Sequence, residues 1–358
     1  MLKAYQLKVA ASDALINSAL LFDKTHVYYE FNENNLAPNN LPLKVFGIQQ
    51  DVRFPTAYIS EKKVYKARFN METSAYEIQK KGLERKLTES YYQYQISRKK
   101  QLLFKKIDSL YQNFTQTAAR RFELGETNYL EKITAASKQQ QIHLKYTQAN
   151  QNVSLAYKDL MQIVQSEDSI QIANESIMKI SLNSLNINNS SEIKYHQNRI
   201  SLFEAQRNFE RQQVLPDISL TYFQGTNSLL NGNLTGYQVG LKIPILFGGK
   251  SSKIKSAKIA KEVAVSESQE YSIQLNTKYN SLKLKLKQLE ETVSYYEKNG
   301  KLLSEEILKT ANGSFKNGEI NFYQYIQSLE SVYEIQLDYL DKLNKYNQTV
   351  IAINYLTL

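Results

Sequence analysis

The residues able to bind a metal ion or to transfer protons are scattered along this sequence. The three histidines stand at His26, His143 and His196. Metal sites need several imidazole, thiolate or carboxylate groups that converge, and the chain has no cysteine. Carboxylate pairs such as Glu305–Glu306 and Glu330–Glu334 accompany no nucleophile or phosphate-binding loop. The sequence therefore predicts no metal site and no cofactor, and it argues against an enzyme.

Two short turns have the most distinctive local pattern in the chain. Both match Phe-x-x-Gly-Glu-x-Asn-aromatic, and their glycines, Gly125 and Gly318, are 193 residues apart. A glycine at such a position accepts a left-handed backbone and ends a helix. We expect each turn to form the tip of a helical hairpin. The residues that we assign to the tips are Phe122, Gly125, Glu126, Phe315, Gly318 and Glu319.

Long helical runs lead to these turns. Residues 56–118 contain no proline and only one glycine, Gly82, and residues 250–312 carry apolar side chains at alternating spacings of three and four. A helix over 56–118 would be roughly 95 Å long at about 1.5 Å per residue. We predict two helical hairpins, over about 56–164 and about 250–356, and an elongated molecule.

Four short segments alternate between apolar and polar residues, which is typical of two-faced strands. They cover about 26–31, 46–54, 217–223 and 237–243, and each pair is joined by a polar loop. A soluble hairpin would give the same alternation. The residues predicted on the apolar, lipid-facing side are Val27, Tyr29, Phe31, Ile48, Val52, Ile218, Leu220, Tyr222, Tyr237, Val239, Leu241 and Ile243.

The order of the predicted elements indicates an internal duplication. A helix over about 4–24 opens a first repeat, 1–164, and a helix over about 193–213 opens a second repeat, 193–358. An irregular linker, 165–192, joins the two repeats and is rich in Asn and Ser. Matching turns, strand ends and element order together favour duplication over chance. The predicted fold class is mainly α with a small β part.

The strands set a condition on assembly. Four strands cannot close a barrel. In lipid, an open edge of about eight residues would leave roughly eight backbone groups without partners, at several kcal/mol each. Strands placed in a bilayer would therefore require a chain that oligomerises. No window of about 18 apolar residues exists, which argues against a membrane-spanning helix.

The formal net charge of +10 raises the question of nucleic-acid binding. Lys and Arg are spread along the helical runs and form no compact basic cluster or reading motif. The sequence therefore argues against a nucleic-acid partner.

Several motifs resemble those of one family. Leu215-Pro216 precedes a strand, Ile243-Pro244-Ile245-Leu246-Phe247-Gly248-Gly249 follows one, and Phe315–Gly318 forms an aromatic-x-x-Gly turn. With the duplicated element order, these motifs are similar to the TolC-type outer-membrane efflux proteins, the exit ducts of Gram-negative multidrug and metal pumps. The segment 41–58, LPLKVFGIQQDVRFPTAY, also resembles outer-membrane modules associated with or fused to heavy-metal RND efflux pumps.

This resemblance implies a passive channel that exports drugs or metal cations. It implies a homotrimer with a twelve-stranded β-barrel in outer-membrane lipid and an α-helical barrel across the periplasm. The loops 32–45 and 225–236 would face outside, and the two Gly turns would form the periplasmic tip. The implied partners are a periplasmic adaptor protein and an inner-membrane pump.

The resemblance also points to a periplasmic entrance. Members of the family carry two aspartates just beyond the second Gly turn, which narrow the entrance and bind cations. The matching positions here are Gln324 and Gln327, which are neutral, and the nearest acidic substitutes are Glu319 and Glu330. A gating role and a plain solvated helix face are both open for these glutamines.

The implied location is the outer membrane and periplasm. Residues 1–20 lack the basic start, apolar centre and cleavage site of a signal peptide. We therefore expect a fragment, or the C-terminal part of a longer exported protein. The alternative is a soluble, elongated coiled-coil interaction protein, such as a periplasmic adaptor or a scaffold. That alternative explains the heptads and the charge but not two equivalent alternating hairpins.

Overall fold

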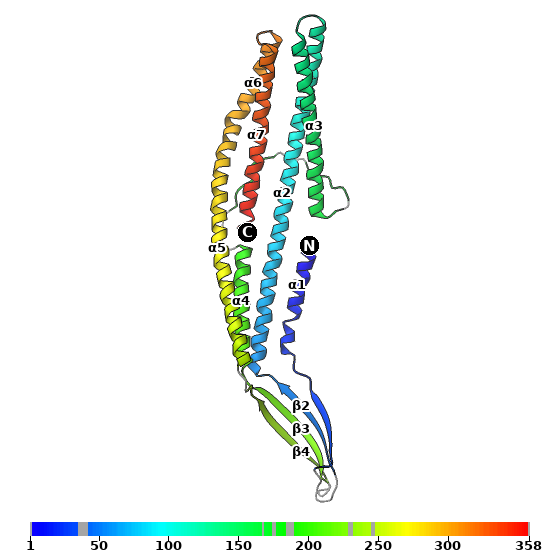
Figure 1. The fold of residues 1–358 in the computed structure, drawn as a ribbon, viewed down its shortest axis with the longest axis vertical. Coiled ribbons are helices and arrows are strands. Elements are labelled where there is room, and N and C mark those ends of the chain that lie inside the picture. The colour runs from blue at the N-terminus through cyan, green and yellow to red at the C-terminus, as the bar shows by residue number, and fades with distance from the viewer. Residues whose placement is uncertain are drawn as a thin grey trace. The chain divides into compact units, whose positions relative to one another are not determined.

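The computed structural model describes residues 2–34, 42–166, 168–173, 177–183, 190–227, 232–244 and 248–356. Helices dominate, and one small antiparallel sheet accompanies them, so the predicted fold class is confirmed (Figure 1). The first series of elements is α1 (Leu2–Ala14), β1 (His26–Asn32), β2 (Leu43–Val52), α2 (Pro55–Glu123) and α3 (Tyr129–Val164). The second series is α4 (Ser191–Gln212), β3 (Asp217–Asn227), β4 (Gly232–Lys242), α5 (Gly248–Tyr295), a π-helical turn (Tyr296–Gly300), α6 (Lys301–Lys316) and α7 (Phe322–Asn354). The order helix, strand, strand, long helix, returning helix thus occurs twice.

The chain forms two compact units that cut across this duplicated order. Unit 1 contains Met1–Lys80 and Asn189–Gln274, and unit 2 contains Lys81–Asn188 and Leu275–Leu358. Unit 1 therefore holds the whole sheet together with α1, α4 and the first parts of α2 and α5. Unit 2 holds both hairpin turns, with α3, α6, α7 and the remaining parts of α2 and α5. Each unit is built from both halves of the sequence.

The sheet of unit 1 has the strand order β1-β2-β3-β4, with every neighbouring pair antiparallel. Its register aligns Val27 with Ile48, Ile48 with Tyr222, and Tyr222 with Tyr237. Directly opposed residues in an antiparallel pair share a face. The register therefore places eleven of the twelve residues predicted on the apolar side on one face, which we call face A. The twelfth, Ile243, follows the end of β4.

The opposite side of the sheet is face B. Along the strands it changes from a row of polar side chains to a row with aromatic rings. Gln49 donates from Nε2 to Ser219 Oγ at 3.0 Å, and Lys242 pairs with Asp51. One step along the strands, two aromatic rings lie over glycines. A Cβ added at Gly47 would come within 2.2 Å of Tyr28 Cζ, and one added at Gly236 within 2.4 Å of Phe223 Cζ. Any larger residue at either glycine would displace a ring.

Several predicted boundaries were wrong, and local hydrogen bonds explain the differences. The first helix ends at Ala14 rather than near residue 24, and a short 3₁₀ turn, Asn17–Leu20, follows it. There the Ser18 hydroxyl donates to Leu15 O at 2.6 Å, a local bond that competes with the helical pattern. Strand β2 ends at Val52 rather than Phe54, because Phe54 O accepts from Ala57 N at 2.8 Å and begins α2.

Other boundaries differ at the second hairpin. Strands β3 and β4 extend further toward their connecting loop than the predicted 217–223 and 237–243. The predicted helix over 250–312 is divided by the π turn Tyr296–Gly300. The loops predicted over 32–45 and 225–236 and the linker predicted over 165–192 lie partly outside the described residues. Residues 245–247 of the Ile-Pro motif lie wholly outside them.

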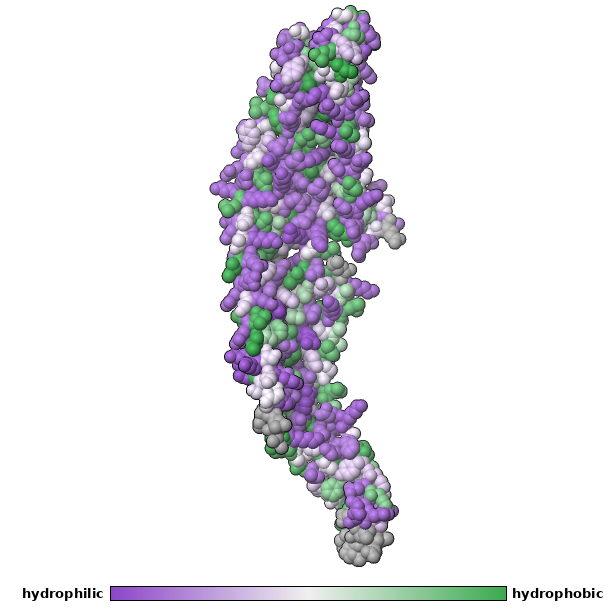
Figure 2. All heavy atoms as spheres, viewed as in Figure 1, coloured by the Kyte–Doolittle hydropathy of each residue, from purple (hydrophilic) through white to green (hydrophobic). Residues whose placement is uncertain are grey.

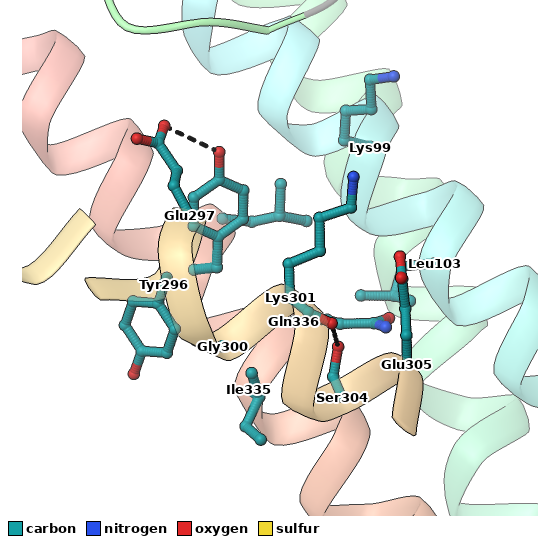
Figure 3. Close-up of a pocket in the computed structure, with 12 residues that line it drawn as sticks. Lys99, Leu103, Tyr296, Glu297, Gly300, Lys301, Ser304, Glu305, Ile335 and Gln336 are labelled. Atoms are coloured by element: carbon teal, nitrogen blue, oxygen red, sulfur yellow. Dashed lines mark hydrogen bonds between the residues drawn. The ribbon is translucent and has the colours of Figure 1, made fainter. Parts of the chain in front are cut away.

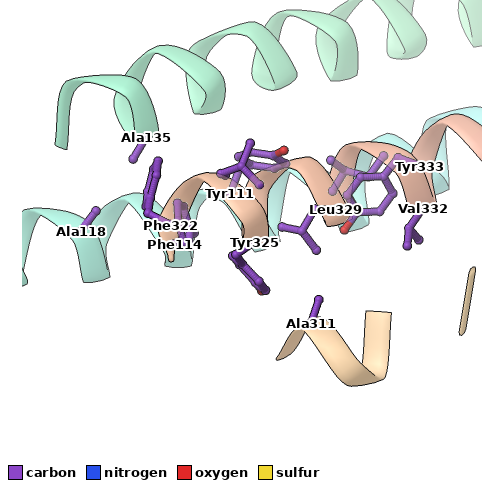
Figure 4. Close-up of a cluster of buried hydrophobic side chains, with 12 residues drawn as sticks. Tyr111, Phe114, Ala118, Ala135, Ala311, Phe322, Tyr325, Leu329, Val332 and Tyr333 are labelled. Atoms are coloured by element: carbon purple, nitrogen blue, oxygen red, sulfur yellow. The ribbon is translucent and has the colours of Figure 1, made fainter. Parts of the chain in front are cut away.

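The core of unit 2 lies around the aromatic side chains near the hairpin turns (Figure 4). Phe114 of α2 packs with its ring centroid 4.8 Å from that of Phe322 and 5.4 Å from that of Tyr325. Phe315 stacks on Tyr325 with centroids 4.5 Å apart, and the Tyr325 hydroxyl donates to Asn312 Oδ1 at 2.7 Å. Aromatic pairs at these separations add to the stability gained from burial. The core therefore joins α2, α6 and α7 just behind the turns.

Two asparagines of α7 hold an extended segment of unit 2, residues 177–183, against that helix. Asn347 is fully buried; its Oδ1 accepts from Ile180 N at 2.9 Å, and its Nδ2 donates to Met178 O at 3.0 Å. One heptad later, Asn354 Oδ1 accepts from Asn183 N at 3.0 Å and Nδ2 donates to Ser181 O at 3.1 Å. Each amide thus pairs with the backbone as a neighbouring strand would. A segment without helix or strand is fixed in this way.

Replacement of Asn347 by Ala should destabilise unit 2. It removes the hydrogen bonds to Ile180 N and Met178 O, at a cost of about 1–3 kcal/mol in the free energy of unfolding. The measurement is denaturant unfolding in detergent, followed by circular dichroism. The matched control is Asn344→Ala on the same helix, whose amide donates only to the Gln93 side chain, at 3.0 Å. Equal losses for both variants would contradict the role assigned to Asn347.

Candidate functional site

The first hairpin turn is closed by a Schellman arrangement. Glu126 N donates to Arg121 O at 2.8 Å and Gly125 N to Phe122 O at 3.0 Å, while Gly125 has φ +75°. This backbone is the left-handed one for which glycine is preferred. Asn128 then caps α3, its Oδ1 accepting from Glu131 N at 2.9 Å. The Phe122 ring packs on Tyr129, with centroids 5.8 Å apart.

The second turn repeats this geometry. Glu319 N donates to Ser314 O at 2.8 Å, Gly318 N donates to Phe315 O at 3.2 Å, and Gly318 has φ +72°. Asn321 caps α7 as Asn128 caps α3. The tip residues assigned from the sequence therefore occupy equivalent places in two equivalent turns. Their contact with an adaptor protein stays a prediction.

Both turns line one cavity of about 730 Å³ within unit 2. Its basic lining residues are Arg121 and Lys316, and its acidic ones are Glu126, Glu131 and Glu319. Arg121 Nε lies 3.6 Å from Glu126 Oε2, and the two side chains form a weak ion pair at an exposed position. The arrangement has charges of both signs and little apolar surface, so it suits contact with a polar partner segment or water more than an apolar ligand.

Gln324, predicted at the entrance, has a structural role at the start of α7. Its Oε1 accepts from Asn321 N at 3.0 Å, and its N donates to Asn321 Oδ1 at 2.9 Å, which completes a capping box. Gln327 lies one turn further along α7 and is exposed. The two glutamines therefore differ in the single chain. Gln324 caps α7, and the side chain of Gln327 is exposed to solvent.

Glu319 is the acidic group of the second turn. Its Oε2 accepts from Ser314 Oγ at 2.7 Å and its Oε1 from Asn317 Nδ2 at 3.2 Å. These hydrogen bonds lower the pKa of the Glu319 carboxyl below its usual value. The side chain is exposed and stays ionised at neutral pH. Glu330, the other substitute predicted from the sequence, pairs instead with Lys138 at 2.7 Å.

A second cavity in unit 2, of about 590 Å³, lies beside the π turn (Figure 3). Lys99 and Leu103 of α2 line it together with Lys301 and Glu305 of α6 and Gln336 of α7. The π turn is fixed by Tyr296, whose hydroxyl donates to Asp338, and this bond raises the pKa of Tyr296 to about 12. Hydrophilic residues cover most of the visible face of unit 2, and hydrophobic ones form separate patches (Figure 2).

Besides the hairpin turns and the two cavities, the sheet is a candidate functional surface. Most of the predicted lipid-facing residues are exposed; Tyr237 is 81% and Val239 73% exposed. Val52 and Ile218 are partly buried at the end of the sheet next to the helices. Within the described strands, β1 and β4 each pair along one side only. The sheet therefore presents an apolar face and two open edges.

The described residues contain no group of three or more His, Cys, Asp or Glu side chains placed to hold a metal ion. His143 Nδ1 lies 3.2 Å from Asp108, and His196 stacks on Tyr271 with ring centroids 4.6 Å apart. Burial lowers the pKa of His196, and the nearby Arg199 adds to the effect. In the described part of the chain, no helix has both the length and the apolar character of a membrane span.

Sequence analysis missed the capping box of α7, the cap at Asn128 and the asparagine clamps. The pattern Asn-x-x-Gln at 321–324 and Asn-x-x-Glu at 128–131 is a recognised helix-start signal and could have been identified. The clamp formed by Asn347 and Asn354 had a weaker signal, two amides one heptad apart in an apolar run. The π turn had no signal of its own.

No protein-family model and no curated protein sequence matches the chain. Solved structures do match it. The MtrE outer membrane channel of Neisseria gonorrhoeae aligns with a TM-score of 0.79 and 11% identity over 99% of this chain and 85% of that chain. VceC, an outer membrane protein of Vibrio cholerae, aligns with a TM-score of 0.78 and 13% identity over 99% of this chain and 92% of that chain. The CmeC outer membrane channel of Campylobacter jejuni aligns with a TM-score of 0.74 and 15% identity over 99% of this chain and 82% of that chain.

The chain therefore has the fold of bacterial outer-membrane channels over nearly its whole length. For the single chain, the fold that the resemblance to TolC-type efflux proteins implied is confirmed. Identities of 11–15% establish fold alone, so the activity of the chain is argued from its own residues.

Replacement of Gly318 by Ala should weaken the second turn by about 1–2 kcal/mol, because an L-residue is strained at positive φ. Gly313, five residues earlier in α6, is the matched control. Neither glycine has an atom within 4 Å of an added Cβ, so only the backbone conformation differs. Gly313→Ala should stabilise the protein by about 0.4–1 kcal/mol. Thermal unfolding of both variants tests this, and shifts of the same sign would contradict it.

Proposed function

We propose that this chain is one of three identical subunits of an outer-membrane exit duct in a tripartite efflux system, a passive channel for drugs or metal cations. The sheet lies in outer-membrane lipid and the helices continue through the periplasm. Face A of the sheet carries this proposal. Eleven aliphatic or aromatic residues share it, and they come from two hairpins that are far apart in the sequence.

The open edges support the oligomer. In hydrocarbon each edge of β1 and β4 leaves roughly one backbone group per residue without a partner, at several kcal/mol each. The total of tens of kcal/mol exceeds the usual domain stability of about 5–15 kcal/mol. Four strands from each of three copies remove the edges by closing a twelve-stranded barrel. The chain matches solved outer-membrane channels in fold, which agrees with this arrangement.

The exposed side chains of the hairpin tips favour contact with partner proteins. At the first turn, Leu124 is 67%, Tyr129 61% and Leu130 71% exposed. Large apolar side chains grouped at an exposed turn favour a protein contact. We propose that the two tips bind the periplasmic adaptor and through it the inner-membrane pump. Gly125 and Gly318 set the shape of these tips.

Planar-bilayer recording tests the proposed function together with the native mass of the refolded protein in detergent. A trimer that forms ion-conducting pores and resists carbonate extraction from membranes supports the duct. A water-soluble monomer without conductance would overturn it and favour the alternative, a soluble coiled-coil interaction protein.

Replacement of Gln324 and Gln327 by Asp should increase the block of this conductance by multivalent cations. Six carboxylates in the trimer would then stand where the neutral amides are now. The control is Ser331→Asp, one helical turn beyond Gln327, which adds the same kind of charge deeper along α7. Block that is unchanged in the double variant would remove these glutamines from the entrance.

A further inference from the structure

One row of residues crosses all four strands on face B of the sheet. Tyr28, Gly47, Phe223 and Gly236 are direct partners from β1 to β4. The far end of the Tyr28 ring lies over Gly47, and that of the Phe223 ring over Gly236. Phe223 therefore has a glycine on both neighbouring strands. Tyr28 lies on an edge strand and has a glycine on one side only.

The register between copies decides what lies on the other side of Tyr28. If the row ran straight into the next copy, the strands would stand upright, whereas closed barrels tilt their strands by about 35–45°. We call the displacement the number of residues by which β1 of one copy is shifted along β4 of the next copy, relative to the straight row. Over twelve strands spaced about 4.8 Å apart, a displacement of two, four or six residues per copy gives strand tilts of about 19°, 35° or 46°. Odd displacements would exchange the two faces.

The lengths of the edge strands favour a displacement of four residues and determine its direction along β4. Strand β1 has 7 residues and β4 has 11. A displacement of four toward the C-terminal end of β4 keeps all of β1 paired. The same displacement in the opposite direction would pair only residues 26–28, and six residues in the favoured direction would leave His26 and Val27 beyond the end of β4.

The four-residue register also gives matching side chains. On face A it pairs Val27 with Leu241, Tyr29 with Val239 and Phe31 with Tyr237, all apolar or aromatic. On face B it sets Tyr28 opposite Gly240. A Cβ added at Gly240 would meet only Ser219 Cβ, at 3.7 Å, so the space over this glycine is open. Displacements of two and six would instead set Gln238 and Lys242 opposite Tyr28.

We infer that β1 of one copy pairs with β4 of the next in this register, Tyr28 opposite Gly240, so that both face-B aromatics stand between two glycines. The inference rests on the proposed trimeric duct. It adds to that proposal which residues meet between copies and the strand tilt, about 35°. The partner surface of each open edge is thus the opposite edge of a second copy of this chain.

Disulfide cross-linking tests the register directly, because the chain has no cysteine of its own. Directly opposed residues have Cα atoms about 4.5–5.5 Å apart, within disulfide range, whereas residues displaced by two lie about 7–8 Å apart. The pair Tyr29→Cys with Val239→Cys should give a covalent trimer on a non-reducing denaturing gel. Reduction should return the 41.4 kDa monomer.

Two further pairs are matched controls, since all the positions lie on face A. Tyr29→Cys with Thr235→Cys reports the straight register, and Tyr29→Cys with Leu241→Cys reports the six-residue displacement. Preferential cross-linking of either control, or no cross-linking of any pair in conducting trimers, would overturn the inferred register and leave the duct intact. A monomeric native mass in detergent would instead overturn the duct itself, and the register with it.

Discussion

The backbone groups along the outer edges of β1 and β4 set the condition on which the rest of this structure depends. In water such an edge is merely solvated, but face A of the sheet also carries eleven aliphatic or aromatic residues drawn from four strands. A lipid environment would suit that face but would make the open edges costly, because hydrocarbon offers them no hydrogen bonds. In the proposed duct, lipid covers the face and other copies of the chain cover the edges.

The helices form a more self-sufficient part of the molecule. In unit 2 the aromatic cluster around Phe114, Phe322 and Tyr325 is buried within a single chain. The amides of Asn347 and Asn354 satisfy the backbone of an extended segment in the same chain. Tertiary hydrogen bonds of this kind do for the segment what a sheet does for a strand. The single chain thus supplies partners for these groups of unit 2 and lacks them along the outer edges of the described sheet.

The features that could be predicted from the sequence are those that depend on local pattern. Alternation located all four strands, and the Gly turns placed Gly125 and Gly318 at the two hairpin tips, because strand faces and left-handed caps are properties of a few adjacent residues. The boundaries near Leu15 and Phe54 were missed, because single hydrogen bonds decide them. The clamp at Asn347 and the π turn at Tyr296–Gly300 were missed for a different reason. Both depend on partners far away in the sequence, Met178 and Ile180 for the clamp and Asp338 for the turn.

The two hairpin turns share their backbone but differ in charge at one equivalent position. The third residue of α3 is Glu131, and the third residue of α7 is Gln324. A carboxylate in the first turn of a helix balances the positive end of the helix dipole, and a neutral amide does not. The acidic residue of the loop before α7 is Glu319, whose carboxylate accepts hydrogen bonds from Ser314 and Asn317. The capping box explains how Gln324 serves the fold without a charge, since its amide oxygen accepts the same hydrogen bond that a carboxylate would.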